Sequence, residues 1–157
     1  FPNPIVSNPM TPQPNLPIDL DALPKRTLAD ATAQELQLEL IRRWQFNDFD
    51  GLDMIEKLVE HQSLWQAVFM DRLGVANRDG GLPLAGMIKL RDLPYNQWNI
   101  DTLYLLCENT AKANELIQKL EFEDLGGMVT IHTDRQEVDN ALGSGRTEQA
   151  IVAVWWD

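Results

Sequence analysis

The sequence has little cysteine and little histidine. Its 157 residues include one cysteine, Cys107, and two histidines. A single cysteine excludes a disulfide within the chain and any zinc site built on two or more thiolates. It also favours a reducing compartment, because cysteines in oxidising compartments usually form disulfides. We therefore expect a cytoplasmic protein that uses no metal and no cofactor.

Positive charge and long apolar runs are also scarce. Only 13 Lys and Arg oppose 24 Asp and Glu, which gives a net charge of −11. Nucleic-acid binders need clustered basic residues, so we expect no direct binding to nucleic acid and none to an anionic membrane. No apolar run approaches the roughly 18 residues that a membrane span needs. The acidic surplus is uneven, with 11 acids against 4 bases from Asp101 onward, and it suits either solubility or a basic partner.

Proline is concentrated at one end, since residues 1–26 hold seven of the nine prolines. Proline is excluded from helix interiors and central strands, so this stretch predicts an extended arm or linker. Apolar residues spaced along it could anchor the arm to a domain: Ile5, Val6, Leu16, Ile18, Leu20 and Leu23. An alternative is that Pro9 and Pro12, at PxxP spacing, form a ligand for an adaptor with an aromatic groove.

Residues 27–74 predict a helical hairpin. Thr32 and Glu35 have the spacing of a capping box, and apolar residues follow at helical intervals. A turn at 47–51 would lead into further helix over 52–73, either one long helix or two, with Asp50 as its cap. The same turn fails as a calcium loop, because Phe46 and Lys57 would occupy two ligand positions.

Residues 82–157 predict the sheet of the domain. Met87–Arg91 alternates apolar and charged residues as an edge strand does. Three further strands, at 102–107, 128–132 and from Ile151 to the end, alternate with helices at 110–120 and 135–142. That βαβαβ order indicates parallel pairing. We therefore expect residues 27–157 to form one small three-layer α/β domain with a mostly parallel sheet of about four strands.

In a parallel sheet the carboxyl ends of the strands share an edge, where ligands bind. Cys107 ends one strand and His132 ends the next, with Asp134 close behind. A thiol, an imidazole and a carboxylate could form an activated nucleophile. The alternative is structural, because buried cysteines often only fill space and Asn109 or Asp134 can cap a helix. The remaining candidates for ligand contact at this edge are Glu108, Asn109, Thr110 and Thr133.

The stretch Gly143-Ser144-Gly145-Arg146-Thr147 is rich in glycine, as anion-binding loops are. It matches neither glycine-rich phosphate fingerprint, and it precedes a strand rather than following one. A helix C-cap followed by a turn accounts for it fully.

No motif in the chain specifies a reaction, so the first hypothesis is a non-enzymatic interaction or regulatory module. It would bind a protein partner through the proline-rich arm or the acidic surface. The second hypothesis is a small thiol-dependent hydrolase that uses Cys107 and His132. The third is an acidic mimic of nucleic acid, which would require the carboxylates to form a regularly spaced stripe.

Overall fold

The computed structural model describes residues 17–74, 80–145 and 148–157. The pair Pro9 and Pro12 lies outside the described residues, as do Arg146 and Thr147. Residues 17–26 lie against the domain through the short 3-10 turn η1 (Leu23–Lys25). Leu23 is buried in the core, and the Ile18 N–H donates to Gln62 Oε1 at 3.2 Å.

The first two helices begin where their caps predict. In α1 (Ala33–Arg43), the Glu35 N–H donates to Thr32 Oγ1 and the Thr32 N–H donates to Glu35 Oε1, each at 3.1 Å. A two-residue turn between β1 (Gln45–Phe46) and β2 (Phe49–Asp50) leads to α2 (Gly51–Glu60). Asp50 caps α2 by accepting from the Leu52 N–H at 3.0 Å. Both cap predictions are confirmed, because capping depends on local spacing alone.

The prediction of helical structure over 52–73, as one long helix or as two, is wrong beyond Glu60. The chain passes through η2 (Gln62–Leu64) and then forms a strand, β3 (Ala67–Asp71). Val68 and Met70 are buried while Phe69 between them is exposed, which is the alternation of a strand. An apolar run of this length fits either structure, and pairing with a distant strand decides it.

The main sheet is antiparallel, which corrects the expectation of a mostly parallel sheet. It consists of β3, β4 (Thr102–Cys107), β5 (Met128–His132) and β6 (Ala150–Trp155), in the order β3-β4-β6-β5, and every neighbouring pair is antiparallel. β4 and β5 do run in the same direction, but β6 lies between them. The alternation of strands and helices locates the strands without showing which of them pair, and here the chain inserts β6 as the central strand.

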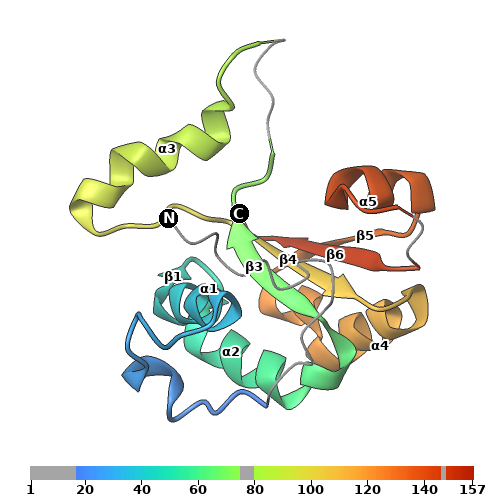
Figure 1. The fold of residues 1–157 in the computed structure, drawn as a ribbon, viewed down its shortest axis with the longest axis horizontal. Coiled ribbons are helices and arrows are strands. Elements are labelled where there is room, and N and C mark those ends of the chain that lie inside the picture. The colour runs from blue at the N-terminus through green and yellow to red at the C-terminus, as the bar shows by residue number, and fades with distance from the viewer. Residues whose placement is uncertain (1–16, 75–79, 146–147) are drawn as a thin grey trace, which may run out of the picture.

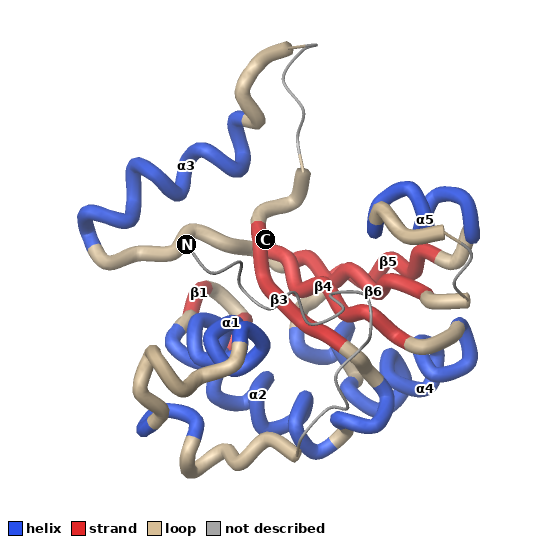
Figure 2. Tube along the Cα trace, in the orientation of Figure 1, coloured by secondary structure: helices blue, strands red, loops and turns tan. Residues whose placement is uncertain are grey.

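The two faces of the sheet differ in cover. Helices α1, α2 and α4 (Thr110–Leu120) lie on one face and enclose the core, while α5 (Arg135–Leu142) lies on the opposite side (Figures 1 and 2). We call this second side the outer face. The strand register places three rows of side chains on it. One row contains Phe69, Tyr104, Ala153 and Thr130, the second Ala67, Leu106, Ile151 and His132, and the third Asp71, Thr102, Trp155 and Met128.

The strand predicted at Met87–Arg91 is wrong, because these residues belong to a helix, α3 (Leu84–Asp92). Alternating patterns of five residues also occur on helices, and among the described residues this one has no neighbouring strand with which to pair. The helix continues into η3 (Leu93–Tyr95) and ends at Asn96, whose φ of 58° breaks it. Figure 1 shows α3 standing away from the sheet and from the other helices.

Candidate functional site

Cys107 and His132 end their strands at the same edge of the sheet but face opposite sides of it. Cys107 pairs with Ala150 and His132 pairs with Ile151, which is the next residue along β6. Consecutive residues of a strand point to opposite faces. Cys107 therefore points into the core, and His132 lies on the outer face. The structure does not bring the thiol and the imidazole together.

The environment of Cys107 is that of a core residue. Its side chain is fully buried, and burial raises the pKa of the thiol to about 11. A thiol nucleophile instead needs a lowered pKa and access to substrate.

Two of the other candidates at this edge cap the helices that follow the strands. Asn109 Oδ1 accepts from the Lys112 N–H at 2.9 Å at the start of α4, and Asp134 Oδ1 accepts from the Glu137 N–H at 2.8 Å at the start of α5. Glu108 pairs with Lys112 at 2.7 Å on the surface. Thr110 is the first residue of α4, and both Thr110 and Thr133 are exposed.

The glycine-rich turn also ends a helix. Gly143 has a φ of 65° and stands at the C-cap of α5, as the sequence predicts. Its N–H bonds to the Asn140 carbonyl, so this backbone donor serves the helix end.

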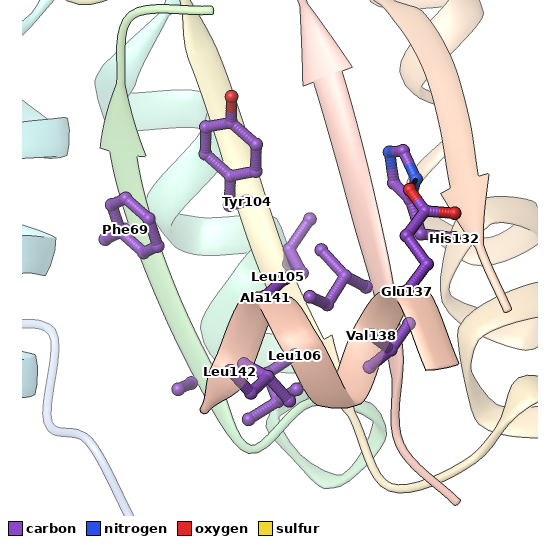
Figure 3. Close-up of a pocket in the computed structure, with 11 residues that line it drawn as sticks. Phe69, Tyr104, Leu105, Leu106, His132, Glu137, Val138, Ala141 and Leu142 are labelled. Atoms are coloured by element: carbon purple, nitrogen blue, oxygen red, sulfur yellow. Dashed lines mark hydrogen bonds and ion pairs between the residues drawn. The ribbon is translucent and has the colours of Figure 1, made fainter. Parts of the chain in front are cut away.

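A cavity of about 400 Å³ lies between α5 and the outer face of the sheet. We call it the α5 groove (Figure 3). Its floor comes from all four strands and its wall from α5, which crosses over the sheet. It is lined by Ala67, Phe69, Tyr104, Leu105, Leu106, His132, Glu137, Val138, Ala141, Leu142 and Ile151. Nearly all of these side chains are apolar, and a concave apolar surface of this size is typical of a binding site.

Two aromatic rings form one end of the α5 groove. Phe69 and Tyr104 are opposite each other on β3 and β4, with ring centroids 5.2 Å apart and planes inclined by 19°. Phe69 remains 44% exposed, so its ring is open to a ligand. Burial, and then the carboxylates of Asp71 and Asp101, raise the pKa of the Tyr104 phenol, which therefore stays neutral.

The opposite end of the α5 groove is polar. His132 Nδ1 lies 2.8 Å from Glu137 Oε1, and Figure 3 shows the two side chains together, away from Phe69 and Tyr104. His132 is half-buried and Glu137 is exposed. The surrounding stretch from His132 to Leu142 carries three acids and one base. The groove thus combines an apolar body with a polar, acidic end.

The sequence predicts His132 as a site residue but does not predict the other residues that line the α5 groove. The apolar pattern places Phe69 in a helix, so its position beside Tyr104 does not follow from the pattern. The signal that could have found it is the short apolar run of Ala67, Val68, Phe69 and Met70, which resembles that of β4.

The described residues offer no ready metal centre. Among them, no three His, Cys, Asp or Glu side chains gather closely enough to hold an ion. In the same ranges, none of the helices has the length and apolar character required to cross a membrane. The α5 groove is accordingly the feature from which a function can be argued. Comparisons with protein-family models, with curated proteins and with solved structures find no match to this chain.

Proposed function

We propose that this domain is a protein-interaction module that binds a basic, apolar segment of a partner protein in the α5 groove. The observation that carries the proposal is the partly covered outer face, where Phe69 and the α5 residues Ala141 and Leu142 border an apolar cavity. Removing apolar surface from water is the main source of binding free energy, about 25 cal/mol for each Å². Leucine-sized side chains of a partner would enter this cavity.

Charge supports a basic partner. The chain has a net charge of −11, and from Asp101 onward acids outnumber bases by 11 to 4. This part includes β4, β5, β6 and α5, which form most of the groove. Glu137 is exposed at the polar end, where it can meet a lysine or arginine of the partner. Complementary charges increase the rate at which two proteins associate, and they orient the partner as it binds.

The observed geometry gives the hydrolase hypothesis no comparable support, because Cys107 and His132 point to opposite faces. A cytoplasmic location, which the single thiol favours, remains part of the proposal.

The test uses a fluorescent model peptide of about 14 residues, which spans ~21 Å as a helix. Leucines occupy one helical face and lysines the other, and a second peptide replaces every leucine by serine at equal charge. Anisotropy should show binding of the leucine peptide to the full chain and much weaker binding of the serine peptide.

Variant Ala141→Lys places a cation at the wall of the groove and should weaken binding of the leucine peptide about tenfold, or about 1.4 kcal/mol. The matched control is Ala111→Lys, an exposed alanine of α4 on the opposite face, which should bind as the wild type does. Equal binding of both peptides, or an Ala141→Lys variant that binds normally, would contradict the proposal.

A further inference from the structure

The segment before Pro17 carries no charged side chain and is rich in proline. Residues 1–16, which we call the arm segment, contain five prolines and no Lys, Arg, Asp or Glu, in a chain of which 24% is charged. Ile5 and Val6 form an apolar pair among the prolines. Proline favours an extended backbone and lowers the conformational entropy that a segment loses on binding. The arm segment therefore has the composition of a ligand for an apolar groove.

The arm segment joins the described chain beside the start of β3. The Ile18 N–H donates to Gln62 Oε1 at 3.2 Å, and Gln62 precedes Ala67, which lines the α5 groove, by five positions. Because each residue spans at most about 3.5 Å, the Cα atoms of Gln62 and Ala67 lie within about 18 Å of each other. The Gln66 N–H donates at 2.7 Å to the carbonyl of Leu106, another lining residue. The arm segment thus begins near one end of the groove.

The arm segment is long enough to cross the α5 groove. Ile5 lies 13 residues before Ile18, which corresponds to about 40 Å of polyproline-like chain. The groove extends across the sheet from β3 to β5, which are three strand spacings or about 14 Å apart. Pro9 lies four residues from Ile5, or about 12 Å in the same conformation. The stretch from Ile5 to Pro9 therefore matches the width of the groove.

The lining of the α5 groove suits an uncharged, proline-rich segment. Phe69 is 44% exposed and stacks with Tyr104 at 5.2 Å between ring centroids. Aromatic-lined grooves are a recurring binding site for proline-rich segments. The aliphatic side chains of α5 that line the groove provide an apolar surface for Ile5 and Val6. The net charge of −11 would repel an acidic segment, whereas an uncharged one escapes this repulsion.

We infer that the arm segment occupies the α5 groove of its own chain, with its prolines against the aromatic pair and with Ile5 and Val6 in the apolar body. The regulatory consequence rests on the proposed function, since the arm segment then competes with the partner for one groove. The arm segment has no cation to meet Glu137, so a basic partner gains a contact that the arm segment lacks. The chain thus covers its own binding site until such a partner displaces the arm segment.

The first experiment locates the arm segment by disulfide cross-linking in the full chain. Ser7→Cys is combined either with Ala141→Cys, at the wall of the groove, or with Ala111→Cys, an exposed position of α4. Because α4 contacts η2, to which Ile18 is bonded, Ala111 is also within reach of the arm segment. The monomeric cross-linked product should form about tenfold faster with Ala141→Cys, since binding raises the effective concentration of the two thiols. Cys107 is fully buried and is common to both variants.

The second experiment measures competition with the fluorescent leucine peptide. In the full chain with Ile5→Ser and Val6→Ser, the arm segment loses its apolar anchors. The leucine peptide should then bind about tenfold more tightly than it binds the wild type, because apparent affinity scales with the fraction of grooves that are open. The matched control is Leu28→Ser, where the leucine is 82% exposed outside the arm segment, and its affinity should equal that of the wild type. Circular dichroism checks that each variant is folded.

Equal rates of cross-linking at Ala141 and Ala111 would overturn the inference, as would an arm variant that binds the leucine peptide only as tightly as the wild type does. Both results differ from a failure of the proposed function. If the leucine peptide binds and the two cross-links form equally, only the assignment of the arm segment to the groove is wrong. If the peptide binds no form of the chain, the proposed function fails, and the cross-linking rates alone decide where the arm segment lies.

Discussion

Gln34 of α1 makes two hydrogen bonds to the backbone of Val68 in β3. Gln34 Nε2 donates to the Val68 carbonyl at 2.7 Å, and the Val68 N–H donates to Gln34 Oε1 at 2.9 Å. β3 is an edge strand, and edge strands carry backbone groups that can pair with another chain. The amide of Gln34 occupies these groups as a neighbouring strand would, and it fixes α1 against the sheet.

Replacing Gln34 by leucine should destabilise the domain by about 1–3 kcal/mol, because a partly buried N–H and C=O lose their partners. Urea unfolding measures this change, and light scattering should report faster aggregation through the open strand edge. Gln37→Leu, one turn further along α1, is the matched control. Equal unfolding free energies for the two variants would show that the pair of hydrogen bonds contributes little.

Gly51 has no room for a side chain. A Cβ added there would lie 2.0 Å from the Ile41 carbonyl oxygen and 2.6 Å from that of Trp44. Both are backbone atoms, so no rotation of a side chain relieves the contact. Gly51→Ala should therefore cost about 3 kcal/mol of unfolding free energy.

The matched control for this change is Gly74→Ala, because nothing lies within 4 Å of a Cβ added at Gly74. It should alter stability by no more than about 0.5 kcal/mol. Thermal or urea denaturation compares the two variants, and a Gly51→Ala protein as stable as the control would refute the close approach.

Cys107 should resist thiol reagents in the folded protein. With a pKa of about 11, only about one thiol in a thousand is ionised at pH 8, and the side chain is fully buried. Labelling with a disulfide reagent should therefore be slow in buffer and fast in denaturant. Rapid labelling of the native protein would instead favour the hydrolase hypothesis.

The raised pKa of Cys107 also makes the stability of the protein depend on pH. The unfolded thiol ionises near its ordinary pKa of 9.0, whereas the folded thiol keeps its proton up to about pH 11. The contribution of Cys107 to stability is thus complete below pH 9 and is lost as the pH rises toward 11. Subtracting the pH profile of a Cys107→Ala variant from that of the wild type isolates this loss.

Features that depend on a few adjacent residues could be predicted from the sequence. The caps at Thr32, Asp50 and Gly143 follow from local hydrogen bonding and from backbone conformation. The strands β4 and β5 follow from their apolar runs. None of these features depends on residues that are distant in the sequence.

Features that depend on distant partners could not be predicted in this way. Val68 becomes part of a strand because β4 is available beside it, about 37 positions further along. Cys107 faces the core because of its register with Ala150, which no local pattern encodes. The α5 groove also depends on long-range pairing, since it forms only where β3 and β4 bring Phe69 beside Tyr104. His132 can be predicted because it ends a strand that the local pattern indicates.

The position of β6 has a consequence for how the protein folds. β5 has β6 as its neighbour in the sheet, and β6 is the last strand of the described chain. The pairs that β6 makes with β5 join residues 19 to 27 positions apart, whereas its pairs with β4 join residues 43 to 53 positions apart. Completion of the sheet therefore depends on long-range pairing of its two central strands, which places the folding rate in the slower range expected for high contact order.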